Sequence, residues 1–331
     1  MSKMSTDRVR YALNGPTMGT RWSALFHAAS SFDAAPVEAA LQAATDEVDA
    51  QMSTWKPDSD LMRLNAAPLN IWIGVPMRLM AVLATALAVG RASDGAFDIG
   101  VGDAVTAWGF GRAEGSLEGI RETLSSPRYR AHDVLELDPA RGRVRKHAPL
   151  TLDLSGIAKG YGVDRLAEVV RAFGITGALV AIDGELRAIG LQPDGAAWAV
   201  AIERPDPVAR APQAMIALHD AAVATSGDYR HWVDIGGRRL SHTMDPARGG
   251  PLVASPASVT VVAASCMAAD AWATALMVRG RLEGVELARR QNLDALFIDR
   301  EGDRLRETPV GRLFEARSGP GAQPDRGMHA R

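Results

Sequence analysis

The sequence lacks the residues for several common kinds of site. Its only cysteine among 331 residues is Cys266, which excludes an internal disulfide and a zinc site built from cysteines. Free cysteines are usually buried, so we expect Cys266 to be a small core residue. The 37 Lys and Arg residues nearly balance the 39 Asp and Glu residues, giving a net charge of -2. This balance offers no electrostatic reason to expect nucleic acid or an anionic membrane as the main partner.

Long apolar runs and targeting signals are also missing. The longest nearly apolar stretch, residues 79–89, is too short to cross a bilayer. The first residues, Met-Ser-Lys-Met-Ser-Thr-Asp-Arg, contain neither the apolar centre nor the small-residue cleavage site of a signal peptide. We therefore expect no membrane span and, by default, a cytoplasmic location.

The familiar nucleotide and hydrolase motifs are absent. No Gly-x-Gly-x-x-Gly follows a predicted strand, and there is no Walker A loop, His-Glu-x-x-His or Gly-x-Ser-x-Gly. A Rossmann dinucleotide site is therefore not supported by the sequence.

Enough apolar residues are present, 47% of the chain, for one large domain or two intertwined lobes. Helical and strand patterns occur in mixed order without sustained βαβ alternation, which predicts an α+β fold with a mixed, largely antiparallel sheet and surrounding helices. We assign residues 1–14 to an N-terminal extension, 15–316 to a single domain and 317–331 to a flexible tail.

Particular elements follow from turn residues and periodicity. Asn14-Gly15-Pro16 predicts a turn that leads into a strand over residues 17–27. Residues 138–142 predict the turn of a hairpin, and residues 151–154 a strand that runs into a helix starting near Gly156. Short strands dominate residues 178–262, followed by a helix over 265–278, a further helix and a final strand pair around 295–306.

One candidate site is the segment Asp153-Leu-Ser-Gly-Ile-Ala-Lys-Gly-Tyr161. A helix start offers backbone N–H groups and the positive end of the helix dipole, and Lys159 adds a positive charge, so the segment could bind phosphate. The alternative is an ordinary cap, with Ser155 at the N-cap and Lys159 in solvent.

A second candidate is Asp270 with Thr274, four residues apart in an apolar helix. This spacing places both side chains on one helix face, where a carboxylate is unfavourable unless it is paired, capped or bound to metal. A carboxylate and a hydroxyl suit magnesium, which completes its coordination with water and phosphate oxygens. The alternative is that Asp270 interacts with the helix dipole and Thr274 bonds a carbonyl one turn back.

Two further candidates are more diffuse. His242 and Thr243 lie in Leu240-Ser-His-Thr-Met-Asp245, where a histidine beside hydroxyls and a carboxylate could transfer protons, or could be an ordinary surface residue before a turn. Three N-terminal pieces, residues 17–22, 52–60 and 95–100, combine glycine or hydroxyl residues with aromatic side chains or methionine. That mixture suits a flat heteroaromatic ring but also occurs in ordinary turns.

Taken in order, these segments resemble the ApbE family of FAD:protein FMN transferases from about residue 16 to residue 298. The matching segments are Met18-Gly-Thr20, Met52-Ser-Thr-Trp-Lys-Pro-Asp-Ser-Asp60, Gly95-Ala-Phe-Asp98, Trp108-Gly-Phe-Gly111, Asp153-Leu-Ser-Gly-Ile-Ala-Lys-Gly160, Ala224-Thr-Ser-Gly-Asp-Tyr229, Ser241-His242 with Asp245-Pro246, and Ala269-Asp-Ala-Trp-Ala-Thr274. Eight motifs in the correct order favour the functional interpretation of each over its alternative.

The resemblance implies a T-fold-related α+β structure with a central FAD cleft and a magnesium ion. It assigns the metal to Asp270, Thr274 and the backbone carbonyl near Gly156, and the reaction centre to His242 and Thr243. The positions that it assigns to FAD contact are Met18, Trp55, Ala96, Phe97, Asp98, Asp153 and Lys159. We expect His242 to act as the base, oriented by Asp245 or Asp228.

The activity implied is transfer of the FMN half of FAD to a Thr or Ser hydroxyl of an acceptor flavoprotein, with release of AMP. The chain contains no Asp-x-x-Ser/Thr-Gly-Ala-Thr motif, so we do not expect it to modify itself through that motif. Two alternatives stay open. A magnesium-dependent FAD pyrophosphatase would use water as the acceptor at the same site, and a non-catalytic FAD-binding protein would bind FAD without turnover.

Overall fold

The computed structural model describes residues 8–229, 232–235 and 238–315, and these residues form the α+β fold predicted from the sequence. The main sheet has the strand order β1-β2-β6-β7-β10-β15-β16-β17, and every pairing in it is antiparallel. Its strands are β1 (Arg8–Thr17), β2 (Thr20–Ala29), β6 (Ala178–Ile182), β7 (Glu185–Ile189), β10 (Ala222–Gly227), β15 (Ser258–Ala263), β16 (Asp294–Glu301) and β17 (Arg304–Val310).

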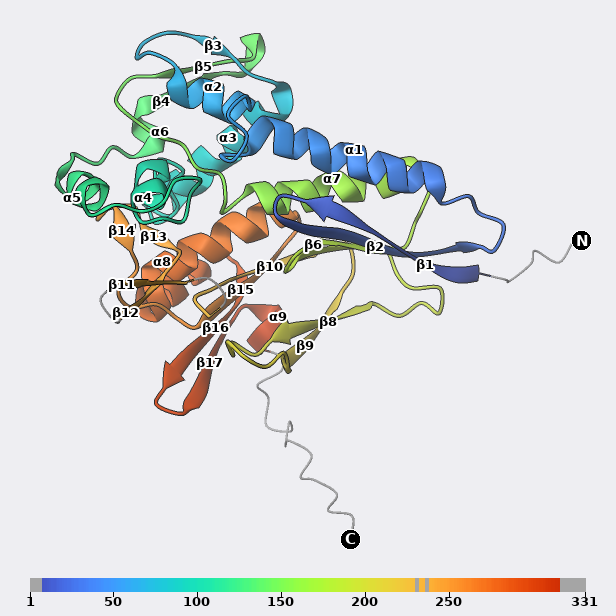
Figure 1. Cartoon of the computed structure of the whole chain (residues 1–331). Helices are drawn as coiled ribbons and strands as arrows, with labels where there is room; N and C mark the ends of the chain where they lie inside the picture. Colours follow the sequence, from blue (N-terminus) through green and yellow to red (C-terminus); the bar gives the residue numbers. More distant parts are fainter. Residues whose placement is uncertain (1–7, 230–231, 236–237, 316–331) are drawn as a thin grey trace, which may run out of the picture.

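Three long helices cover one face of this sheet (Figure 1). They are α1 (Ala35–Met52), α7 (Ala158–Ala172) and α8 (Cys266–Arg290). Alternation along β2 explains the layer: Trp22 and Phe26 point into a core with Leu41 of α1 and Val163 of α7, whereas Leu25 packs on the opposite side. Cys266 is fully buried in the same core, as predicted.

A β-hairpin and a short helix cover the opposite face. The hairpin is formed by β8 (Trp198–Glu203) and β9 (Pro212–Leu218), and α9 (Arg312–Glu315) lies beside it. Trp198, Ile216 and Phe314 from these elements pack against Val223 and Ile298 of the sheet. The central strands of the sheet are therefore covered on both sides.

A second group of elements packs against α8 through α3. It comprises α2 (Asp60–Ala66), β3 (Ile73–Gly74), α3 (Met77–Ala92), α4 (Gly102–Ala107), α5 (Leu117–Ser125), α6 (Ala131–Val134), β4 (Leu135–Asp138), η1 (Pro139–Arg141) and β5 (Arg143–Lys146). The hairpin predicted around residues 138–142 is confirmed, and it pairs with β3 in a three-stranded sheet. Four short strands connect β10 to β15: β11 (Trp232–Ile235), β12 (Arg238–Ser241), β13 (Met244–Asp245) and β14 (Gly250–Pro251).

The predicted N-terminal turn is wrong. Residues 8–14, assigned from the sequence to an extension, form most of β1, and the chain reverses at Met18-Gly19 instead of Asn14–Pro16. Pro16 is tolerated because β1 is an edge strand. Gly15 serves close packing, since a Cβ there would lie 2.6 Å from the Trp22 ring nitrogen.

The predicted strand over residues 151–154 is also wrong. This segment joins no sheet. The side-chain amide of Asn65 pairs with both backbone groups of Leu152, donating over 2.9 Å and accepting over 2.7 Å. On the other side, Asp153 N–H donates to the Ile99 carbonyl. A side chain and a loop thus take the place of neighbouring strands.

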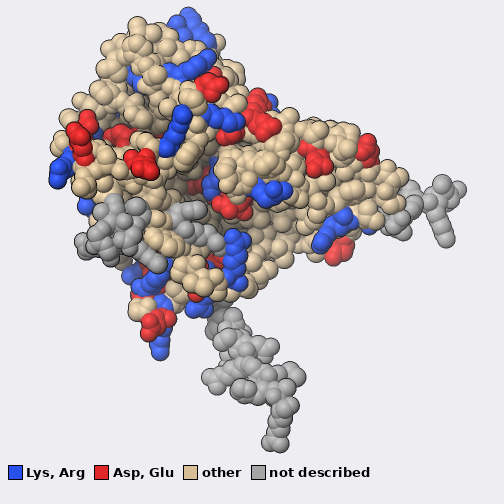
Figure 2. All heavy atoms as spheres, in the orientation of Figure 1, with Lys and Arg blue, Asp and Glu red and all other residues tan. Residues whose placement is uncertain are grey.

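Two general expectations can be compared with the described residues. Across the described ranges, no helix combines the length and apolar character needed to cross a membrane. Basic and acidic side chains are interspersed on the face shown in Figure 2, in keeping with the nearly balanced charge of the chain.

Candidate functional site

The site begins at the turn that leads into α7. Asp153 is buried, and its Oδ1 accepts the N–H of Ser155 at 2.8 Å. Burial raises the pKa of this carboxyl group. The N-cap of α7 is Ile157, which has no polar side chain, so the alternative of an ordinary Ser155 cap is wrong. An acceptor for the first turn of the helix must come from elsewhere.

Helix α8 supplies that acceptor where it crosses α7. Asp270 is 5% exposed, and its Oδ2 accepts the N–H of Gly160, the third residue of α7, at 3.0 Å. The crossing is close because Gly160 has no side chain: a Cβ there would lie 2.4 Å from the Cys266 carbonyl oxygen. Asp270 therefore lies against the Asp153–Lys159 segment, as the predicted metal ligand set of Asp270, Thr274 and the Gly156 carbonyl requires.

Thr274 lies one turn further along α8, on the face that Asp270 occupies. Its Oγ1 lies 3.1 Å from the point where a Cβ on Gly156 would stand. The same atom lies 3.2 Å from the Oγ of Ser226 in β10. The structure thus brings Gly156, Asp270 and Thr274 together, and their role as metal ligands stays a prediction.

The charges next to Asp270 do not balance. Lys159 Nζ lies 2.8 Å from Glu185 Oε1 and 3.7 Å from Asp183 Oδ2. Glu185 is almost fully buried, and its Oε2 has no hydrogen-bond partner among the described residues. Three carboxylates thus accompany one ammonium group, and a divalent cation would compensate the excess negative charge.

The pKa values show how strongly this imbalance acts. Burial raises the pKa of Asp270 to about 7, and the negative charge of Glu185 adds to the rise. Burial lowers the pKa of Lys159, but attraction from Glu185, Asp270 and Asp183 outweighs it, so the net shift is upward. Lys159 therefore stays charged, whereas Asp270 is held in its ionised form only weakly without a cation.

The kind of metal site is limited by what surrounds Asp270. Among the described residues, no three His, Cys, Asp or Glu side chains come close enough together to hold a metal ion. A cation beside Asp270 would therefore take a hydroxyl, backbone oxygens, water or substrate oxygens as its other ligands. That is the ligand preference of magnesium, which is seldom held by protein side chains alone.

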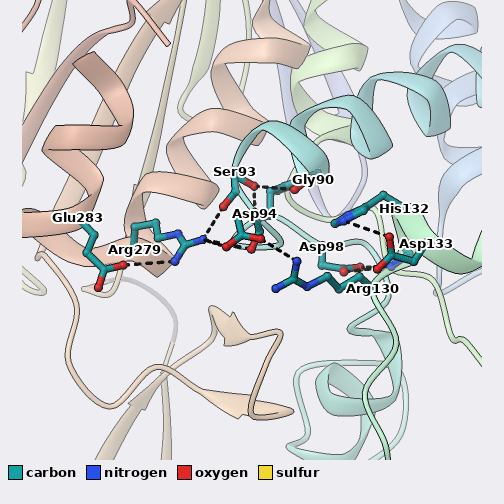
Figure 3. Close-up of polar contacts among 11 residues, drawn as sticks. Gly90, Ser93, Asp94, Asp98, Arg130, His132, Asp133, Arg279 and Glu283 are labelled. Carbon is teal, nitrogen blue, oxygen red and sulfur yellow. Dashed lines mark hydrogen bonds and ion pairs between the residues drawn. The ribbon is translucent and has the colours of Figure 1, made fainter. Parts of the chain in front are cut away.

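The loop Ser93–Asp98 forms the next wall. Phe97 and Ala96 are buried, and the Phe97 ring lies 3.3 Å from the Cβ position of Gly156. Ser93 Oγ accepts the N–H of Phe97 at 3.0 Å. Asp98 accepts the N–H groups of Gly100 and Ala131, so its carboxylate shapes the loop (Figure 3). Burial raises the pKa of Asp98.

Met18 lies next to α7, close to Gly162. It occupies the left-handed region, with φ 44°, in the two-residue turn between β1 and β2. Its Cε lies 3.0 Å from the point where a Cβ on Gly162 would stand. A left-handed conformation is unfavourable for a non-glycine residue and is often found at functional sites.

A cavity of about 350 Å³ lies beside Asp153, lined also by Thr54, Gly102, Thr106 and Arg112. Trp55 follows Thr54 and is 61% exposed, which is unusual for so large an aromatic side chain. An exposed indole next to a cavity can stack on a planar ligand.

His242 and Thr243 belong to a different part of the chain. The His242 ring packs edge-on to Phe110, with centroids 6.4 Å apart. Thr243 is buried, and its N–H donates to Ser241 Oγ. Trp108 Nε1 donates to the Gly249 carbonyl, which joins this segment to the Trp108–Gly111 motif.

The two carboxylates expected to orient His242 have other partners. Asp245 accepts the N–H groups of Ala247 and Arg248 in the following turn. Asp228 pairs with Arg300 at 2.8 Å and accepts from Ser255. These contacts favour structural roles for both acids. Arg230 and His231, from the same sequence motif, lie outside the described residues.

Sequence reasoning missed three residues of this site. Glu185 pairs with Lys159, Ser226 bonds Thr274, and Asn65 holds the segment that carries Asp153. Each contact joins residues far apart in the chain, so no local sequence pattern predicts it.

Together these features place the start of α7 and Lys159 beside the buried pair Asp270 and Thr274, with more carboxylates than ammonium groups around them. A model described as "ApbE family" matches residues 18–297. The FAD:protein FMN transferase of Escherichia coli strain K12 is 35% identical over 297 residues, covering 88% of this chain and 84% of that protein.

Solved structures agree with these matches. The flavin transferase ApbE from Vibrio cholerae superposes with a TM-score of 0.81 at 33% identity, covering 92% of this chain and 97% of that one. The apo flavinyl transferase ApbE of Pseudomonas stutzeri gives a TM-score of 0.79 at 35% identity, covering 92% and 95%. The chain belongs to the ApbE family.

Proposed function

We propose that this protein is a magnesium-dependent FAD:protein FMN transferase. The observation that carries the proposal is the meeting of Gly156, Asp270 and Thr274 at the first turn of α7. A helix start that binds phosphate and a pair that binds a cation occur at one place, as cleavage of a diphosphate requires. The names of the relatives support the same activity.

FAD is held by its rings and by its phosphates in this proposal. Asp153 and Trp55 bind one end of FAD at the cavity beside Thr54. The loop Ala96–Asp98 and Met18 form other walls of the FAD site. Lys159 and the first turn of α7 receive the diphosphate. Simultaneous contact with rings and phosphates fixes the reacting phosphorus, and such positioning accounts for much of the acceleration in enzymes.

Asp270, Thr274 and the Gly156 carbonyl are the protein ligands that we assign to magnesium. When bound, the ion would neutralise the diphosphate and stabilise the negative charge that develops during cleavage. The excess of carboxylates around Lys159 supports this assignment, because it leaves the site short of positive charge.

The chemical step is transfer of a phosphoryl group to an oxygen. The acceptor hydroxyl oxygen forms a bond to the phosphorus of the FMN half, and the bond from that phosphorus to the bridging oxygen breaks, releasing AMP. His242 takes the hydroxyl proton as general base. Its position against Phe110, in a loop joined to the Trp108–Gly111 motif, supports a role at the reaction centre.

The acceptor is proposed to be a flavoprotein subunit with a Thr or Ser flavinylation motif. The experiment is coexpression with such a subunit followed by intact-mass measurement. Addition of one FMN that requires magnesium, and is lost with Asp270→Asn and with the acceptor hydroxyl replaced by Val or Ala, would support the proposal. Rapid release of FMN and AMP from FAD without acceptor would favour a pyrophosphatase. FAD binding without any turnover would favour a non-catalytic protein.

A further inference from the structure

Helix α8 continues past Thr274 to Arg279, where its regular path is interrupted. The next residue, Gly280, has φ 69° and ψ 178°, values outside the helical region. Arg279 is thus the last residue before a kink, and its side chain is 27% exposed. It lies five positions beyond Thr274, about 7.5 Å along the axis.

Arg279 binds the end of α3 rather than a single surface acid. Its Nη2 donates to the Ser93 carbonyl at 2.7 Å and the Asp94 carbonyl at 3.1 Å, and lies 3.5 Å from Asp94 Oδ2 (Figure 3). Its Nη1 lies 3.3 Å from Glu283. Ser93 is the C-cap of α3, so Arg279 satisfies carbonyl groups at the end of that helix.

A second arginine holds the same loop from another side. Arg130 Nη1 bonds Asp94 Oδ1 at 2.7 Å, and its Nε lies 3.1 Å from the Cβ position of Gly95. Asp94 and Gly95 both have positive φ, 53° and 77°. Two arginines from different elements thus hold a loop whose backbone is unfavourable for Asp94 (Figure 3).

The held loop leads directly to the wall of the site. A Cβ placed on Gly156 would lie 3.3 Å from the Phe97 ring and 3.1 Å from Thr274 Oγ1. The loop and α8 therefore meet at Gly156, and Arg279 joins them a second time. Two attachments between the same pair of elements fix their relative position better than one.

We propose that Arg279 is a positioning residue for FAD. It fixes the loop Ser93–Asp98 against the helix that carries Asp270 and Thr274. This inference rests on the proposed function, which assigns that loop to FAD binding. The competing explanation is a surface ion pair that contributes only a little stability. The two explanations differ because the strongest contacts of Arg279 are with backbone carbonyls that set the path of the loop.

The test compares Arg279→Ala and Arg279→Lys with Arg281→Ala. Arg281 is a matched control, because it lies two residues further along the chain, just past the kink at Gly280, is 29% exposed and pairs with Asp299 at 3.3 Å. FAD affinity is measured by flavin fluorescence without acceptor, KM and kcat by FMN transfer, and stability by thermal unfolding. We expect Arg279→Ala to raise both the Kd and the KM for FAD about tenfold, with kcat at saturating FAD nearly unchanged.

Arg279→Lys should rescue only part of this loss, because an ammonium group cannot reproduce the fork of donors that spans two carbonyls. Arg281→Ala should leave the Kd and the KM within about twofold, as for an exposed ion pair. Unchanged FAD affinity in Arg279→Ala, with only a lower melting temperature, would overturn the proposal. So would an equal loss of FAD affinity in Arg281→Ala.

Asp94→Asn provides a second variant if Arg279→Ala does not fold. It keeps both carbonyl acceptors but removes the charge that the two arginines share, so the Kd should rise about threefold. An unchanged Kd would count against the proposal. If the proposed function itself is wrong, wild-type protein will transfer no FMN. The fluorescence titration would still show whether Arg279 affects FAD affinity, so the two failures can be told apart.

Discussion

Two buried aspartates at the crossing of α7 and α8 each accept backbone N–H groups from the other helix, but their charges are compensated differently. Asp164 of α7 reaches across to accept the N–H groups of Cys266 and Met267 at the start of α8, each at 2.9 Å. Asp270 of α8 reaches back to Gly160 near the start of α7. Their exposed fractions, 6% and 5%, are almost equal, so burial does not distinguish them.

Their neighbours do distinguish them. Asp164 is paired with Arg187, so its charge is compensated within the protein. Asp270 has the buried carboxylate of Glu185 nearby, and the ammonium group of Lys159 is shared with Glu185 and Asp183. A buried acid with its own arginine is a structural element, whereas one left with an uncompensated charge is suited to an external cation.

The largest effect should come from neutralising Asp270. In Asp270→Asn the side-chain oxygen can still accept from Gly160, so the fold should persist. We expect FMN transfer to fall about 1000-fold, because loss of a metal ligand removes several kcal/mol of transition-state stabilisation. Initial rates at saturating magnesium and FAD, with circular dichroism as the folding control, measure this. Activity near that of the wild type would remove Asp270 from the metal site.

Neutralising Asp164 should damage stability instead. Asp164→Asn leaves the Arg187 guanidinium, whose Nε is already buried without a partner, lacking its counter-ion. We expect a loss of about 3 kcal/mol in the free energy of unfolding, measured by urea titration. Transfer activity per folded molecule should stay within about twofold. A loss of activity comparable to that of Asp270→Asn would erase the distinction between the two acids.

Magnesium itself should separate the two positions. At a concentration about 100 times its dissociation constant, a ligand that binds only the folded state stabilises it by about 2.7 kcal/mol. Wild-type protein and Asp164→Asn should therefore gain thermal stability on addition of magnesium, whereas Asp270→Asn should not. Calcium and sodium chloride at matched ionic strength serve as controls. Equal stabilisation of all three proteins would point to binding elsewhere.

The smallest effect concerns Thr274. Replacement by Val keeps the shape and removes the hydroxyl, so the magnesium concentration for half-maximal rate should rise about tenfold. Thr274→Ser, which retains the hydroxyl, should stay close to the wild type. If Val and Ser behave alike, the contact of Thr274 with Ser226 is only structural.

The sequence predicted the local part of this arrangement. Four-residue spacing placed Asp270 and Thr274 on one face of α8, because helical geometry alone determines it. Their contacts with α7 were beyond local reasoning, since Gly160 lies 110 residues from Asp270. The family resemblance supplied that connection, and the matches at 33–36% identity confirm the family.

Errors arose where an unusual partner replaced the expected one. Residues 151–154 have the pattern of a strand, but their partner is the side chain of Asn65, 87 residues from Leu152. Gly15 and Pro16 resemble turn residues, but one serves packing against Trp22 and the other lies on an edge strand. In both places, tertiary contacts decided the structure.

The close approach at Gly160 has a consequence for any attempt to rebuild this site elsewhere. Grafting Asp270 and Thr274 onto another helix would transfer the oxygen atoms but not the backbone N–H of Gly160 or the carbonyl of Gly156. The Gly160 N–H comes within reach of Asp270 because a hydrogen atom stands where other residues carry a side chain. The transferable unit is therefore the pair of crossing helices, and a design that copies the ligands alone would omit the spacing between them.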